Sequence, residues 1–164
     1  MDLDQIESKI MDGLCDFCNT AYLEGLSDGG WTVGIKELLA KIGLEFGFKT
    51  CASSDKGHEP EWLFDLLWYK SDSNSHITEI GLVVESEWIM DDDELIYDFE
   101  KLLLAKSTNK LFIFQAWGID EIERITKHLV GHIDAFKAKL SPEKYLFAAL
   151  DTSNKKFEFR HKIC

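Results

Sequence analysis

Three acidic side chains lie in or beside apolar segments of this chain, where an ionised carboxylate is costly unless it is paired or holds a metal. Asp65 interrupts the apolar run of residues 61–70, and Glu85 and Glu87 follow the apolar run of residues 80–84. Carboxylate oxygens are hard ligands that suit Mg²⁺ or Mn²⁺. A metal held by Asp65 and Glu85 could activate a water and neutralise charge developing on phosphorus. These residues therefore suggest metal-dependent phosphodiester hydrolysis.

Glu87 has a less defined role in this chemistry. It lies two residues after Glu85, so in a regular strand both side chains project from the same face. Glu87 could serve as a third ligand or as a base that orients water, but it cannot supply positive charge. An alternative interpretation is that all three acids form a solvated edge of a sheet and bind nothing.

The elements that must position these acids can be predicted from hydrophobic periodicity and from short β-branched or aromatic runs. Apolar residues spaced three or four apart predict helices over residues 2–25, 31–46, 91–107 and 122–140, the last closed by Pro142. Short apolar runs predict strands over residues 48–53, 61–70, 76–88, 111–117, 145–150 and 156–159.

This order of elements predicts a single α/β domain over residues 1–164, with a mixed central sheet and helices on its faces. The unbroken apolar runs of residues 80–84 and 111–117 are typical of central strands buried on both sides. The helix between them is long enough for a parallel crossover. Its acidic start at residues 91–94 suits the positive end of the helix dipole.

The order helix, three strands, helix, strand over roughly residues 31–117 resembles the PD-(D/E)xK nuclease-like superfamily, the fold of many restriction endonucleases and repair nucleases. The resemblance implies a restriction endonuclease-like core, extended here by an N-terminal helix and by a C-terminal helix and hairpin. It implies that Asp65 is the acid of the second core strand and Glu85 the acid of the third, together holding one or two Mg²⁺ ions. Glu37 matches the glutamate that often completes the site from the first helix.

The chain departs from the family pattern at the lysine that normally stands two residues after the second acid. Glu87 occupies that position. Some members of the superfamily carry a migrated lysine on the following helix, and Lys101 and Lys106 are the local substitutes here. The resemblance thus implies a divergent nuclease with Lys101 as its electrophilic group, or a degenerate relative that has lost activity.

Charge is distributed unevenly along the chain, whose formal net charge is −12. Residues 1–100 hold 6 Lys and Arg against 23 Asp and Glu, whereas residues 101–164 hold 12 against 7. Affinity for phosphate backbones comes largely from Lys and Arg, so any nucleic-acid contact is expected through the basic C-terminal third. The alternative is a non-catalytic interaction module, of the inhibitor, immunity or assembly-subunit kind, whose acidic surface binds a basic protein. A homodimer is a third possibility.

The sequence favours a cytoplasmic protein without a membrane anchor. No stretch approaches 18 uninterrupted apolar residues, and the acidic start lacks the apolar core of a secretion signal. The four cysteines are expected to be reduced thiols.

Two further pairs have the spacing of metal ligands. Cys15 and Cys18 could form half of a zinc site, and His128 and His132 are four residues apart on a predicted helix. Neither pair has an obvious partner motif in the sequence. The favoured interpretation is therefore incidental or buried cysteines and exposed helix histidines.

Overall fold

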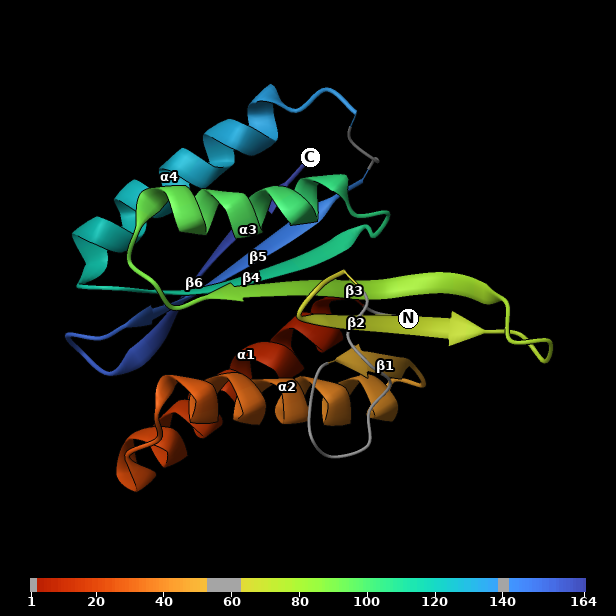
Figure 1. Cartoon of the computed structure of the whole chain (residues 1–164), viewed down its shortest axis with the longest axis horizontal. Helices are drawn as coiled ribbons and strands as arrows, with labels where there is room; N and C mark the ends of the chain where they lie inside the picture. The colour runs from red at the N-terminus through yellow and green to blue at the C-terminus, as the bar shows by residue number, and fades with distance from the viewer. Residues whose placement is uncertain (1–2, 53–62, 139–141) are drawn as a thin grey trace.

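A six-stranded mixed sheet lies between two pairs of helices in the computed structural model, which describes residues 3–52, 63–138 and 142–164 (Figure 1). The elements in chain order are α1 (Leu3–Glu24), α2 (Asp28–Glu45), β1 (Lys49–Ala52), β2 (Leu66–Ser71), β3 (Ile77–Glu87), α3 (Asp92–Leu104), β4 (Asn109–Ala116), α4 (Ile119–Ala135), β5 (Lys144–Asp151) and β6 (Lys156–Ile163). The predicted α/β class and the predicted order of elements are confirmed.

Strand order in the sheet follows strand order in the chain, from β1 at one edge to β6 at the other. The pairs β3–β4 and β4–β5 are parallel, and the remaining pairs are antiparallel. Each parallel pair needs a crossover, which α3 and α4 provide. Two right-handed crossovers that step in the same direction must cover the same face. Figure 1 shows α3 and α4 on one face of the sheet and α1 and α2 on the other.

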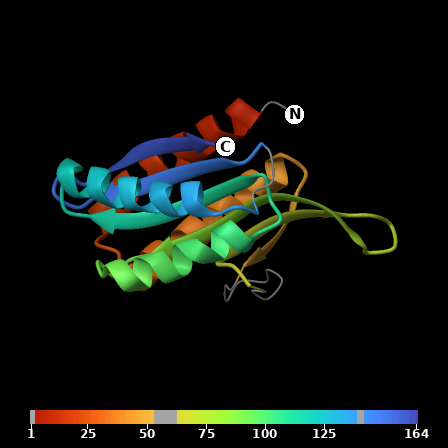
Figure 2. The ribbon, with the colours of Figure 1, turned by 90° about the horizontal axis from the view of Figure 1, so that it is seen from above.

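The three parallel strands are buried on both faces, as their apolar runs predict. In β4, Leu111 and Ile113 pack with the residues of α1 and α2, while Phe112 and Phe114 pack with those of α3 and α4. Figure 2 shows α3 and α4 lying side by side over this central part of the sheet. Successive side chains of β4 point to opposite faces of the sheet, so this one strand contributes residues to both hydrophobic clusters.

Helix α1 packs against the last strand of the sheet, so the two ends of the chain meet in one hydrophobic cluster. Its apolar stripe, which includes Ile10 and Leu14, joins Phe157 of β6 in the cluster on the α1–α2 face. Cys18 donates a hydrogen bond from its sulfur to the carbonyl of Lys155, at 3.5 Å, next to the start of β6. The helix therefore needs the C-terminal hairpin to bury its apolar side.

The second strand begins later than predicted, so Asp65 precedes the strand instead of lying within it. Strand β2 starts at Leu66, which lies opposite Val84. The next ladder hydrogen bond would involve the backbone N–H of Ser86, but this group donates to the Asp65 carboxylate at 2.8 Å. A side chain thus replaces the backbone acceptor there and ends the ladder. Residues 61–62 of the predicted strand lie outside the described part of the chain.

Helix ends also differ from the periodicity-based prediction. Helix α2 begins at Asp28, before the predicted start, because the side chain of Ser27 accepts a hydrogen bond from Gly30 N and caps the helix. Helix α4 ends at Ala135, because Phe136 turns to an extended conformation. Helix α3 ends at Leu104 for the same reason, since Ala105 is extended. Residues 139–140 of the predicted last helix are not among the described residues.

Helix α2 approaches the sheet closely enough at Gly43 to exclude a side chain. A Cβ atom there would lie 2.7 Å from Nε1 of Trp68, whose side chain is fully buried and cannot move aside. We expect Gly43→Ala to lower the free energy of unfolding by about 1–3 kcal/mol, as overpacking usually does. Gly131→Ala in α4, where a Cβ meets nothing within 4 Å, should instead stabilise the protein by about 0.5–1 kcal/mol. Urea unfolding of both variants checks this, and equal effects would contradict it.

A buried charged triad joins the starts of β4 and β5 on the α3–α4 face. The Lys110 ammonium lies 3.0 Å from Glu143 Oε1 and 3.0 Å from the Tyr145 hydroxyl, which donates to Glu143 Oε2 at 2.8 Å. Burial lowers the pKa of Lys110, and the contact with Glu143 opposes this shift. Burial and the hydrogen bond to Glu143 raise the pKa of Tyr145. The triad thus holds a charge pair inside the apolar core.

Candidate functional site

The predicted acids gather where β3 ends, and Asp65 is held there from the α2 side of the sheet. Its Oδ2 accepts hydrogen bonds from the backbone N–H and the hydroxyl of Ser86, at 2.8 and 2.7 Å. Its Oδ1 lies 3.2 Å from the ammonium of Lys36 on α2, a lysine side chain that is 7% exposed. Asp65 therefore has a fixed orientation set by groups from β3 and α2.

Glu85 is held from the opposite face of the sheet, by α3. Its side chain is buried, and its Oε2 lies 3.2 Å from the ammonium of Lys101. Lys101 also contacts Asp98 Oδ1 at 2.7 Å. Helix α3 starts beyond the end of β3 and runs back along it (Figure 1), which allows the side chain of Lys101 to reach Glu85. The predicted substitute lysine thus reaches the predicted acid, whereas Lys106 is exposed beyond the end of α3.

Glu87 projects toward the same helix as Glu85. One of its carboxylate oxygens accepts a hydrogen bond from the backbone N–H of Ile89 at 2.5 Å. Burial is the largest cause that raises the pKa of Glu87, and a hydrogen bond with Asp98 adds to it. Glu87 therefore keeps its proton to higher pH than an isolated glutamate would.

The site contains more acid than base. Four carboxylates, those of Asp65, Glu85, Glu87 and Asp98, meet two ammonium groups, those of Lys36 and Lys101. Burial and the charge of Asp65 together raise the pKa of Glu85 to about 8, although Lys101 acts in the opposite direction. The two carboxylates are thus close enough to repel each other.

One oxygen of Glu85 lacks a hydrogen-bond partner among the residues that the structure describes. Within the described residues, Oε1 of Glu85 is buried and makes no hydrogen bond. A buried carboxylate oxygen without a partner is unfavourable, and a bound cation is one way to satisfy it. This oxygen is the observation in the structure that fits a metal ligand.

The predicted three-ligand arrangement is not assembled among the residues that the structure describes. Within them, no three His, Cys, Asp or Glu side chains form a group that could hold a metal ion, so Asp65, Glu85 and Glu37 do not make such a group. Glu37 is half-buried on α2, and its neighbour Lys36 contacts Asp65 instead. Mg²⁺ is commonly held by one or two carboxylates and several waters, so the pair Asp65 and Glu85 suffices in number.

Sequence reasoning missed three residues of the site: Lys36, Ser86 and Asp98. Asp98 could have been found, because it stands three residues before Lys101, the spacing of neighbours on a helix surface. Ser86 follows Glu85 directly and faces the other side of β3. No sequence pattern identifies Lys36 as a site residue, because its contact with Asp65 depends on how α2 lies against the sheet.

At least half of the cations in the basic C-terminal third form ion pairs within the described part of the chain. At least six of the twelve have carboxylate partners: Lys101 with Glu85, Lys110 with Glu143, Arg124 with Asp92, Lys156 with Glu158, Arg160 with Glu123, and Lys162 with Asp134. The surface predicted to contact nucleic acid therefore offers fewer free cations than its composition suggests.

The cysteine pair of α1 does not form a reactive or metal-binding site in the described structure. Cys15 is exposed and Cys18 is buried, and both are free thiols. Burial raises the pKa of Cys15, and it raises that of Cys18 to about 11. Neither sulfur is therefore activated as a thiolate at neutral pH.

Two observations bear on the chain as a whole. Among the described helices, none is long and apolar enough to cross a bilayer. Comparison of the chain with models of protein families, with curated proteins and with solved structures found no match. Conclusions about function therefore depend on the geometry and chemistry of the residues at the end of β3.

Proposed function

We propose that this protein is a divergent metal-dependent nuclease, built on a PD-(D/E)xK-like core, that hydrolyses phosphodiester bonds. The observation that carries the proposal is the pairing of Lys101 with Glu85, whose other oxygen is buried without a partner within the described structure. A lysine brought from α3 to the acid of β3 is what a migrated catalytic lysine requires. It compensates for Glu87 at the family's lysine position.

The topology supports the same proposal. The elements α2, β1, β2, β3, α3 and β4 follow the helix, three strands, helix, strand order of the superfamily. The first three strands are antiparallel neighbours, and β4 runs parallel to β3. Asp65, immediately before β2, and Glu85, near the end of β3, thus lie at the same edge of the sheet, where α/β sheets commonly bind ligands.

Six residues of the site have roles in this proposal. Asp65 and Glu85 hold Mg²⁺ or Mn²⁺, which supplies a water of lowered pKa and neutralises charge on the scissile phosphate. Lys36 and Ser86 fix the orientation of Asp65. Lys101 stabilises negative charge near Glu85 and is positioned by Asp98.

A direct test measures Mn²⁺ binding by calorimetry and cleavage of plasmid DNA and of RNA with Mg²⁺ or Mn²⁺. Asp65→Asn and Glu85→Gln should lose both Mn²⁺ binding and cleavage. Lys101→Met should retain Mn²⁺ binding and lose cleavage by roughly 100-fold, the usual cost of removing one group that stabilises developing charge. Glu79→Gln, which removes an exposed carboxylate from the same strand, is the matched control.

The proposal fails if the folded wild-type protein binds no Mn²⁺ and cleaves neither nucleic acid with either ion. It also fails if cleavage persists unchanged in Asp65→Asn and Glu85→Gln, because a contaminating nuclease would then account for it. Circular dichroism of each variant shows whether loss of activity reflects loss of fold.

A non-catalytic acidic interaction module is the second candidate, and one observation favours it. Asp65 and Glu85 already have lysine partners, and these come from opposite faces of the sheet. In that case the six-residue charge cluster is structural, and the net charge of −12 provides the binding surface for a basic protein. Asp65→Asn would then leave partner binding intact, and no divalent ion would support cleavage.

A further inference from the structure

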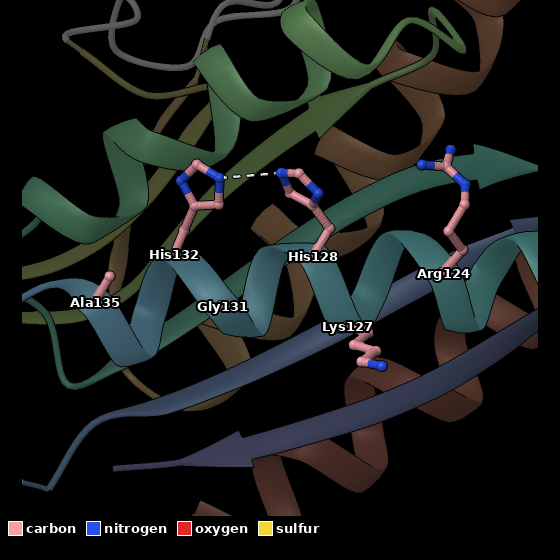
Figure 3. A pocket seen from close by; sticks show the side chains of 6 residues that line it. All are labelled: Arg124, Lys127, His128, Gly131, His132 and Ala135. Carbon is pink, nitrogen blue, oxygen red and sulfur yellow. Dashed lines mark hydrogen bonds between the residues drawn. The ribbon is translucent and has the colours of Figure 1, made fainter.

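The histidine pair of α4 has the geometry of two ligands for one ion. The Nε2 atoms of His128 and His132 lie 3.2 Å apart, and the two rings are stacked with centroids 5.1 Å apart. Figure 3 shows the two rings projecting from the same side of α4, with these nitrogens facing each other. Two nitrogens bound to one tetrahedral Zn²⁺ are roughly 3.4 Å apart, so chelation needs little movement.

A carboxylate from the neighbouring helix orients one of these histidines and sets its tautomer. Nδ1 of His132 lies 3.2 Å from Oε1 of Glu100 on α3. The Glu100 carboxylate can only accept a hydrogen bond, so Nδ1 of His132 keeps its proton and Nε2 carries the lone pair that faces His128. Histidine ligands of metals almost always have such an outer hydrogen-bond acceptor, which fixes the tautomer and the ring orientation.

The site is open to solvent on one side. The two rings border a hollow of about 550 Å³, whose lining also includes Arg124, Lys127 and Gly131. The side chain of His132 is 29% exposed. An ion held by both nitrogens would therefore have room for water molecules in its remaining positions.

Neighbouring charges do not oppose a cation there. The Arg124 guanidinium makes two hydrogen bonds with Asp92, at 2.8 and 2.9 Å, and is thereby neutralised. Figure 3 shows the Lys127 side chain leading away from the two rings. Glu100 adds a negative charge beside His132.

We propose that His128 and His132 chelate a late divalent transition-metal ion such as Zn²⁺, with Glu100 orienting His132. Within the described residues no third His, Cys, Asp or Glu completes a ligand group, so water fills the remaining positions. Imidazole nitrogens favour Zn²⁺, Ni²⁺ and Cu²⁺, whereas carboxylates favour Mg²⁺ and Mn²⁺. This site is therefore distinct from the carboxylates of Asp65 and Glu85 in both place and metal preference.

Calorimetric titration of the full chain with ZnCl₂ and with NiCl₂, in a buffer free of chelators and phosphate, tests the proposal. His128→Ala and His132→Ala should each abolish the binding event. Glu100→Gln should weaken it by roughly 10- to 100-fold, the usual effect of removing an outer partner of a metal-binding histidine. His76→Ala removes an exposed histidine that also contacts a carboxylate, that of Asp72, and should change nothing.

Several results would overturn the proposal. One is Zn²⁺ binding that both histidine variants retain, and another is Zn²⁺ binding that Glu85→Gln removes, since the ion would then occupy the carboxylate site. A third is a protein that binds neither Zn²⁺ nor Ni²⁺ but binds phosphate, with phosphate binding lost in His128→Ala. That result would identify an anion site. His128 is exposed, so its variant is expected to fold, which circular dichroism checks. The outcome is independent of whether the protein cleaves nucleic acid.

Discussion

Glu85→Gln should stabilise the metal-free protein at alkaline pH, although it removes a proposed metal ligand. Burial and the nearby charge of Asp65 raise the pKa of Glu85 from 4.5 to about 8. Below pH 4.5 the folded and unfolded states are both protonated. Between 4.5 and 8 only the unfolded state releases the proton, so stability falls as pH rises. Above pH 8 the loss of stability from ionising Glu85 in the folded state is complete, on the order of 5 kcal/mol at about 1.4 kcal/mol per pKa unit.

Urea unfolding at pH 4.5, 6 and 9 measures this effect. The free energy of unfolding of the wild type should fall across the series more steeply than that of Glu85→Gln, which has no proton to lose at this position. Glu79→Gln on the same strand should follow the wild type, because Glu79 is 48% exposed and paired with Lys70 at the surface. Parallel curves for wild type and Glu85→Gln would show that Glu85 ionises freely in the folded state.

Lys110→Met should destabilise the fold by about 3–5 kcal/mol, the usual cost of breaking a buried ion pair by removing one partner. The ammonium is fully buried and contacts Glu143, whose side chain is 1% exposed. Removing the ammonium leaves the Glu143 carboxylate in the core with Tyr145 as a donor but without the neutralising charge. Guanidinium unfolding at pH 7 measures the loss.

A double variant separates loss of the ion pair from loss of packing. Lys110→Met combined with Glu143→Leu should recover most of the stability, because apolar residues of similar volume often replace a buried pair without cost. Lys70→Met, which breaks the surface pair with Glu79, should cost less than about 1 kcal/mol. If the double variant is less stable than Lys110→Met alone, the pair is not the source of the destabilisation.

The order of helices and strands was predictable because the burial of one face gives each element its own spacing of apolar residues along the sequence. The stripe of α1 and the unbroken apolar run of β4 each identify their element without reference to the rest of the chain. Parallel pairing of β3 with β4 followed from the length of α3 between them. Element order and sheet class therefore need only local information.

The geometry of the site was less predictable, because it depends on contacts between elements. Asp65 was expected inside a strand, and its bond to Ser86 N–H ends the ladder instead. Contact between Lys101 and Glu85 depends on α3 running back over β3, which the sequence of α3 alone does not encode. The role of Lys36 depends on the angle at which α2 crosses the sheet, which no local pattern encodes.

The packing of α1 on the final hairpin has a consequence for synthesis of the protein. Helix α1 leaves the ribosome long before β6 does, and its apolar stripe, with Ile10 and Leu14, has no complete surface to cover it until β6 has emerged. Exposed apolar surface of this kind is where nascent chains aggregate or recruit chaperones. Emergence of β6 from the ribosome, and not that of any earlier element, is therefore the step that lets the nascent chain cover the apolar stripe of α1.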